Sequence, residues 1–206
     1  MRKKASKRPV MVRIRTARYG VAIPLVSPNA SLFDLPENGA DDEDDDDPDL
    51  LPEEEETDED VSALHDLLVK IGFDPADLQK ADSSEPERSE FLSEGRLVQS
   101  DDRVEILYEE SIITGMEGSV TSVGFSLAEP SVISMLRQGP VNTALIFEPH
   151  RRHISLYQTP YSAMEVCIHT LAVRNQLLSS GSLYLDYLMD IHGMSTERCK
   201  MWLTVE

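Results

Sequence analysis

Apolar and polar residues alternate along most of the chain from Phe91 to the C-terminus, and this alternation restricts the possible folds more than any other feature. Val104, Ile106 and Tyr108, for example, fall on one face of an extended segment, because side chains two positions apart in a β-strand point the same way. Clusters of Gly, Pro, Ser and Asp separate the alternating segments and indicate turns. The pattern predicts strands at residues 10–15, 91–98, 103–108, 117–127, 132–137, 141–148, 153–158, 164–174, 183–191 and 199–205.

Short strands joined by short turns, without a helical pattern between them, are typical of an antiparallel meander. A long open sheet leaves unpaired strand edges, so closure on itself is the simplest arrangement for consecutive hairpins. We therefore predict an all-β protein that forms one closed antiparallel barrel of about 8–10 strands. The predicted organisation is a flexible basic N-terminus at 1–9, a first strand region at 10–26, an insertion at 27–87 and the remaining barrel at 88–206. Such an insertion is tolerated because loop-closure entropy grows only logarithmically with length.

The protein has 206 residues and a formal net charge of -19, but its charges are distributed in blocks. Residues 1–20 contain eight Lys and Arg and no acid, whereas residues 37–60 contain sixteen Asp and Glu and no base. An acidic segment with few apolar residues cannot bury enough surface to offset the entropy lost on ordering. We expect this part of the insertion to be disordered, as a solvated linker, a loose cation-binding segment or a binding site for a basic partner.

A short amphipathic helix is predicted at residues 60–72, directly after the acidic segment. Its apolar residues Val61, Leu64, Leu68 and Ile71 recur at helical spacing. A capping Asp begins the helix and a Gly ends it. The helix could pack on its own domain or dock on a partner.

Several classes of protein are disfavoured by the composition. The two cysteines, Cys167 and Cys199, lack the spacing of a metal knuckle or a disulfide framework, and no run of 18 apolar residues could span a membrane. The N-terminus lacks the apolar core of a signal peptide, so we expect a cytoplasmic protein. The strongly negative net charge and the absence of interleaved basic and aromatic residues disfavour nucleic-acid binding.

Four short motifs, taken in their order and spacing, carry a resemblance to a known family. They are Tyr108-Glu-Glu-Ser111, Thr114-Gly-Met-Glu-Gly118, Arg137-Gln-Gly139 followed by Val141-Asn142, and Leu156-Tyr-Gln-Thr-Pro-Tyr161. Together they resemble the YwiB-like family of small, uncharacterised bacterial proteins. The resemblance implies a calycin-like, lipocalin-type barrel in the cytoplasm, and it implies no established activity or cofactor. The sequence departs from the family in the insertion at about 27–87 and in Ser162-Ala163, where a Gly would be more usual.

A carboxylate and a guanidinium are predicted inside the barrel. Glu109 and Glu110 are adjacent on a strand, so they point to opposite faces and cannot form a general acid/base pair. Glu110 continues the inward row of Val104 to Tyr108, and Arg137 continues the inward row of Ile133. Because an isolated buried carboxylate is costly, Arg137 is the natural partner of Glu110. The pair could be an ion pair that closes one barrel end, or a polar anchor for a ligand.

The predicted ligand-binding residues are Tyr108, Glu110, Arg137, Tyr157 and Tyr161, near the polar end of the barrel. The tyrosines could line a cavity or simply fill the core of a small barrel. The sequence thus favours a non-enzymatic barrel protein that binds a small apolar or amphipathic ligand. The alternative is a protein-interaction module in which the acidic segment and the helix at 60–72 bind a basic partner.

No catalytic residue, metal ligand or cofactor is predicted. Cys167 and His169 are two positions apart on one strand face, as an activated thiol would require, but no oxyanion donor is evident nearby. His150 and His153 fall in a predicted hairpin turn, and no further zinc ligands occur at a recognisable spacing.

Overall fold

The computed structural model describes residues 5–21, 85–191 and 195–206. The predicted helix at 60–72 and the acidic residues 37–60 lie outside the described residues. The described residues form ten strands and one turn of 3-10 helix, η1 (Ile112–Thr114). The strands are β1 (Ser6–Val21), β2 (Glu87–Gln99), β3 (Arg103–Glu109), β4 (Val120–Ser126), β5 (Glu129–Gln138), β6 (Thr143–Phe147), β7 (Arg152–Gln158), β8 (Ala163–Gln176), β9 (Ser182–Ile191) and β10 (Ser195–Val205).

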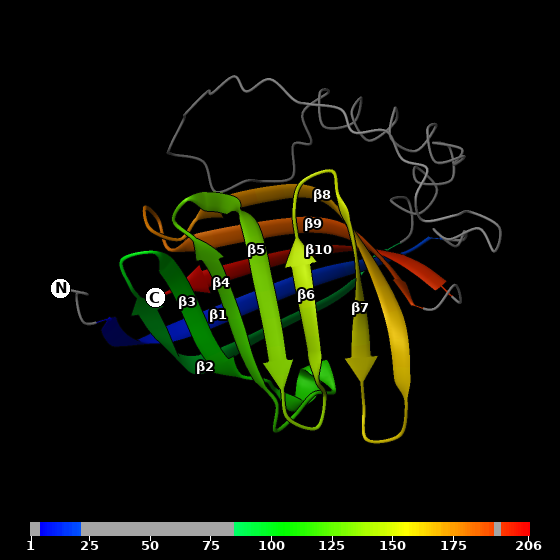
Figure 1. The fold of residues 1–206 in the computed structure, drawn as a ribbon. Helices are drawn as coiled ribbons and strands as arrows, with labels where there is room; N and C mark the ends of the chain where they lie inside the picture. Colours follow the sequence, from blue (N-terminus) through cyan, green and yellow to red (C-terminus); the bar gives the residue numbers. More distant parts are fainter. Residues whose placement is uncertain (1–4, 22–84, 192–194) are drawn as a thin grey trace.

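The strands make a single antiparallel sheet that curls into a barrel (Figure 1), in the order β6-β5-β4-β3-β2-β1-β10-β9-β8-β7. The first strand lies in the middle of this sheet, where it joins β2 to the C-terminal strand. In register, Ile14 of β1 is opposite Phe91 of β2 on one side and Leu203 of β10 on the other. The prediction of an all-β antiparallel barrel is therefore confirmed.

The barrel is nearly closed along the line between β6 and β7. Asn142 and Gln158 exchange two backbone hydrogen bonds of 2.9 and 2.8 Å across this line. Further along, the Ser155 hydroxyl donates a hydrogen bond to the carbonyl of Ala144. These contacts join β6 and β7, the two edge strands of the sheet, at one end of the line where the barrel closes.

The alternating residues predicted to point inward form the core. Val104, Ile106 and Tyr108 are each at most 4% exposed, in line with the predicted inward row of β3. The side chains that are less than 2% exposed come from both halves of the sheet and, apart from Leu188, fill the middle of the barrel; they are Phe147, Ile106, Ile133, Ile168, Leu183, Leu185, Leu188, Leu203, Val12, Val104 and Val123. All of these except Leu188 belong to the one hydrophobic cluster of the core.

The sequence predicts a break at Glu129-Pro130, between the strands at 117–127 and 132–137, but this prediction is wrong, because both residues belong to β5. The turn lies two residues earlier, and the β4–β5 pairing shifts its register at Ser126, which is opposite Glu129. Proline cannot donate a ladder hydrogen bond, and strand ends and bulges are the positions that tolerate it. The two-residue turn and the shifted pairing of Ser126 with Glu129 therefore accommodate Pro130 at the start of β5.

Gly95 is required where β1, β2 and β3 pack closely. A Cβ atom at this position would lie 2.6 Å from the carbonyl oxygen of Leu107 and 2.7 Å from a methyl group of Val12. Gly20, near the end of β1, has open space around the same position. The barrel wall is thus tight at Gly95 and open at Gly20.

Candidate functional site

The connection between β3 and β4 shapes one end of the barrel. The Ser111 hydroxyl caps η1 by accepting a hydrogen bond from the backbone amide of Ile113, and Gly115 ends the turn in the left-handed conformation, with a φ of 70°. The backbone amide of Glu110 donates to the carbonyl of Ser119, so the two strands stay paired beyond η1. As a result, Glu110 remains in the inward row and η1 lies beside it.

Glu110 and Arg137 form a buried ion pair inside this end. Arg137 donates from Nη2 and Nε to Glu110 Oε1, at 2.9 and 3.1 Å. Thr121 donates to the same oxygen at 2.6 Å, and Thr114 of η1 donates to Oε2 at 3.1 Å. The Arg137 and Glu110 side chains are only 9% and 2% exposed. The structure therefore contains the predicted pair, and hydrogen bonds from two threonines complete the coordination of its carboxylate.

Two tyrosines extend this polar cluster into the interior. Tyr108 is opposite Thr121 in the β3–β4 register, and Tyr187 of β9 packs edge-on against Phe147 at a centroid distance of 4.9 Å. Burial raises the pKa of Tyr108 above its ordinary value, and the Glu110 carboxylate raises it further. Burial likewise raises the pKa of Tyr187. Both phenols therefore stay protonated and can serve as hydrogen-bond donors at neutral pH.

Two buried hydroxyls of the inward rows have no hydrogen-bond partner. Thr143 of β6 is opposite Arg137, and Thr170 of β8 is opposite Tyr187. Thr143 is 5% exposed and Thr170 is fully buried, and neither Oγ1 atom is hydrogen-bonded. Buried polar atoms are nearly always paired, so the Thr143 hydroxyl marks the interior beside Arg137 as a place where a polar partner fits. The Thr170 hydroxyl marks a second such position, on the strand pair that contains Tyr187. Sequence reasoning missed them, because a threonine in an inward row is ordinary in a strand.

The remaining predicted residues lie further out. Tyr157 of β7 is half-buried, and its hydroxyl contacts the sulfur of Met116, in the same connection as η1, at 3.5 Å. Tyr161 is 96% exposed in the turn after β7. Of the five predicted residues, the structure thus brings Tyr108, Glu110 and Arg137 together, places Tyr157 beside the same loop, and leaves Tyr161 in solvent.

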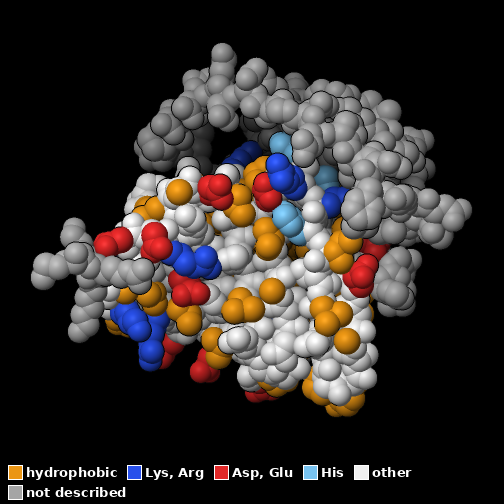
Figure 2. All heavy atoms as spheres, viewed as in Figure 1, with side chains coloured by type: hydrophobic (Ala, Val, Ile, Leu, Met, Phe, Trp, Pro, Cys, Tyr) orange, Lys and Arg blue, Asp and Glu red, His pale blue; other side chains and the backbone are white. Residues whose placement is uncertain are grey.

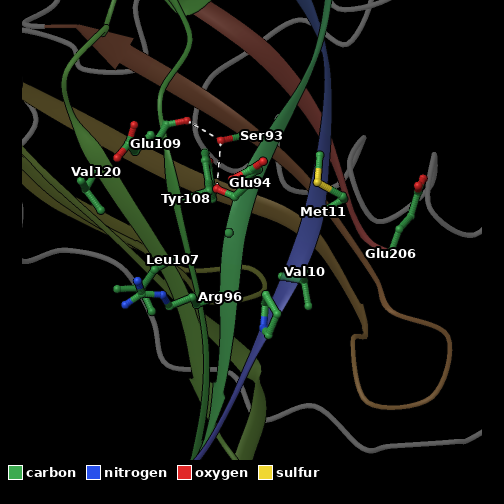
Figure 3. Close-up of a pocket in the computed structure, with 12 residues that line it drawn as sticks. Val10, Met11, Ser93, Glu94, Arg96, Leu107, Tyr108, Glu109, Val120 and Glu206 are labelled. Atoms are coloured by element: carbon green, nitrogen blue, oxygen red, sulfur yellow. Dashed lines mark hydrogen bonds between the residues drawn. The ribbon is translucent and has the colours of Figure 1, made fainter.

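An open hollow lies on the outer side of the same region, where β2 separates from β3 (Figure 3). The pairing of these strands ends at Gly95 and Tyr108, and beyond it the Ser93 hydroxyl donates to the carbonyl of Glu109 at 3.0 Å. The hollow has a volume of about 1060 Å³, and its walls are Pro9, Val10, Met11, Ser93, Glu94, Gly95, Arg96, Leu107, Tyr108, Glu109, Val120 and Glu206. Tyr108 is thus shared between the wall of this hollow and the interior cluster.

The arrangement of Cys167 and His169 does not support an activated thiol. Burial raises the pKa of the Cys167 thiol, although a nucleophilic cysteine needs a lowered pKa. The pKa of His169 is lowered to about 4 by burial and by the neighbouring Arg152 and His150. Neither ring nitrogen of His169 has a hydrogen-bond partner, so the imidazole makes no bond to the thiol.

Two further features concern only the residues that the structure describes. Within that part of the chain, no cluster of three or more His, Cys, Asp or Glu residues could hold a metal ion. None of its helical segments has the length and apolar character needed to cross a membrane.

These observations define a class of protein: a ten-stranded, nearly closed meander barrel with a buried Glu–Arg pair at one end. A crystal structure of the ywiB protein from Bacillus subtilis has a similar fold, with a TM-score of 0.52 and 12% sequence identity over 100% of this chain and 95% of that chain. A family model described as a domain of unknown function (DUF1934) matches residues 77–203, which is more than half of the chain. The chain belongs to this family. The resemblance to YwiB-like proteins is therefore confirmed, and β1 and most of the insertion lie outside the matched residues. No curated protein matches the sequence.

Proposed function

We propose that this protein binds a small amphipathic molecule whose polar end lies beside Glu110 and Arg137, inside the barrel. The observation that carries the proposal is the buried, unpartnered hydroxyl of Thr143, which is opposite Arg137; the unpartnered hydroxyl of Thr170, opposite Tyr187, is a second polar group inside the barrel. Leaving a buried hydroxyl without a partner costs about 1–3 kcal/mol, and a ligand that hydrogen-bonds to it would recover that cost. The finer description of the barrel as calycin-like is part of this proposal.

The chemistry of the cluster favours an uncharged head group. The charges of Glu110 and Arg137 compensate each other, and both carboxylate oxygens of Glu110 already accept hydrogen bonds. The protonated phenols and the threonine hydroxyls can both donate and accept. A hydroxyl or amide group on the ligand matches these partners, whereas a second ion would be buried without a counter-charge.

The packing of the core favours a ligand of limited size. Side chains such as Phe147 and Ile106 are fully buried and fill the middle of the barrel. The ligand would therefore lie at the end near η1, with its apolar part against Tyr108 and Tyr157. Both described cysteines are free, in keeping with a reducing compartment, and we place the protein in the cytoplasm.

Native mass spectrometry of the protein purified from its own cells tests the proposal. We expect the protein to carry a small molecule, and we expect the double variant Thr143→Val/Thr170→Val to lose it, because both hydroxyls are replaced by methyl groups of similar shape. Tyr161→Ala is the matched control, since that side chain is 96% exposed, and it should retain the molecule. The proposal fails if the unaltered protein carries no small molecule, or if the double variant retains it as well as the control does.

A further inference from the structure

The first part of β2 has a free edge. Residues 87–94 pair with β1, from Glu87 opposite Arg18 to Glu94 opposite Met11. On the other side of β2, the register with β3 ends at Gly95, so β3 pairs only with residues 95–99. Among the described residues, the stretch 87–94 therefore has strand partners on one side only. We call residues 87–94 the free edge; an edge of this kind can pair with one further extended segment.

The barrel holds the free edge in an extended conformation. Phe91 belongs to the hydrophobic core and packs against Tyr108, at a ring-centroid distance of 6.2 Å. On the outer face, Arg13 of β1 forms an ion pair with Glu90 at 2.8 Å. A backbone that is already ordered loses little conformational entropy when a partner binds to it. The free edge is therefore a preformed template for a strand.

The open hollow begins at the end of the free edge, where β3 diverges from β2. The last pair of the register is followed by Glu94 on β2 and Glu109 on β3, so both side chains leave the sheet on its outer face (Figure 3). Both residues line the hollow, and neither has an ion-pair partner among the described residues. Like charges at neighbouring cross-strand positions repel each other, so a cation beside them is favourable.

The other charged residues of the hollow do not remove this preference. They are Glu206 and Arg96. Glu206 is already paired with Arg13, at 3.2 Å. Arg96 carries one positive charge, so it can compensate only one of the carboxylates of Glu94 and Glu109. The hollow therefore favours a basic occupant.

Exposed apolar side chains lie around the free edge. Ile112 and Ile113 of η1, which contacts β2, are 72% and 60% exposed, and Val120 of the hollow is 41% exposed. The outward side chains in the middle of β5 and β6, such as Leu136 and Ile146, are also apolar, but no acidic side chain lies between them (Figure 2). Of these two surfaces, only the one at β2 combines a free edge, apolar side chains and negative charge.

We propose that the free edge of β2 binds an extended, basic segment of a partner protein. The segment adds a strand beside residues 87–93 and leaves the sheet over the hollow, with a basic side chain between Glu94 and Glu109. Backbone hydrogen bonds supply affinity in strand addition, whereas the charges select the partner. A sequence of alternating basic and apolar residues fits best, because its bases then share the outer face with the two carboxylates. This surface is outside the barrel and does not depend on the ligand proposed above.

A synthetic peptide of alternating Val and Lys is the probe for this surface. Its binding to the full-length protein at physiological salt would be measured by fluorescence anisotropy. The double variant Glu94→Lys/Glu109→Lys should weaken binding by about tenfold or more. Glu129→Lys/Glu165→Lys is the matched control, because both side chains are exposed on β5 and β8 and the change in net charge is the same. The control should bind the peptide as the unaltered protein does.

Two results of the binding assay would overturn the proposal. One is that the Val–Lys peptide does not bind the unaltered protein. The other is that both double variants weaken binding equally, since the peptide would then respond only to net charge. A peptide of alternating Val and Glu should not bind, because it brings further carboxylates to Glu94 and Glu109.

Amide hydrogen exchange tests the backbone pairing separately and requires no substitution. In the free protein, the amides of residues 87–93 that face β1 should exchange slowly, and those that face the free edge should exchange fast. The Val–Lys peptide should slow the fast set by about tenfold or more. Unchanged exchange with the peptide bound would overturn strand addition. Slow exchange of this set without peptide, lost on dilution, would identify a second copy as the occupant and also overturn the proposal.

Discussion

Replacing Arg137 tests whether the buried ion pair organises the polar end of the barrel. In Arg137→Met, Glu110 loses the two charge-assisted hydrogen bonds from Nε and Nη2 and keeps only those from Thr114 and Thr121. The carboxylate is 2% exposed, so water cannot replace the lost partner. Removing one member of a buried ion pair typically costs about 3–5 kcal/mol of unfolding free energy.

An exposed ion pair of the same length provides the matched control. Arg18 and Glu87 are also 2.9 Å apart, but their side chains are 47% and 73% exposed. Arg18→Met should therefore cost about 1 kcal/mol or less. Because the two N–O distances are equal, the difference between the variants measures the effect of burial.

Urea unfolding monitored by circular dichroism measures both effects. With a slope of about 2 kcal/mol per M, the Arg137→Met midpoint should fall by about 2 M, whereas the Arg18→Met midpoint should move by about 0.5 M or less. The double variant Glu110→Leu/Arg137→Met should recover part of the loss, since no uncompensated charge then remains. Equal midpoints for Arg137→Met and Arg18→Met would refute the reasoning.

Three further predictions concern packing and pH. Gly95→Ala should lower the unfolding free energy by about 1–3 kcal/mol through overpacking, whereas Gly20→Ala should be nearly neutral; comparable urea midpoints for the two would contradict the tight packing at Gly95. The pKa of His169 is about 4 in the folded protein against 6.5 ordinarily, so the unfolded state binds more protons between these values and stability falls as the pH drops from 6.5 to 4. His169→Gln should reduce this pH-dependent loss of unfolding free energy by on the order of 3 kcal/mol. If the urea midpoints at pH 7 and pH 4.5 differ by the same amount in His169→Gln and in the unaltered protein, the histidine is not buried as a neutral group. Phe147→Ala should cost about 3–5 kcal/mol and Tyr161→Ala less than about 0.5 kcal/mol in the same assay, and similar losses would mean that Phe147 is not a core residue.

The local parts of the fold were predictable because alternation is a local property. A strand places every second side chain on one face, so the inward rows of Val104 and Ile133 follow from residues a few positions apart. The same rule predicted that Glu110 and Arg137 point into the barrel. Because burying an isolated charge is costly, it was also predictable that the two side chains form an ion pair. Strand ends were less predictable, since a bulge at Ser126 moved the start of β5 to Glu129.

The sequence alone therefore determined the type of sheet, the faces of its strands and one buried ion pair. Only the tertiary structure showed that β1 lies between β2 and β10, and that Thr143 and Thr170 have no partner inside the barrel. It also showed that Cys167 is buried although it points outward. The physical reason is that periodicity states which side of a strand a residue occupies, whereas its partners and covering layers depend on contacts between residues far apart in the chain.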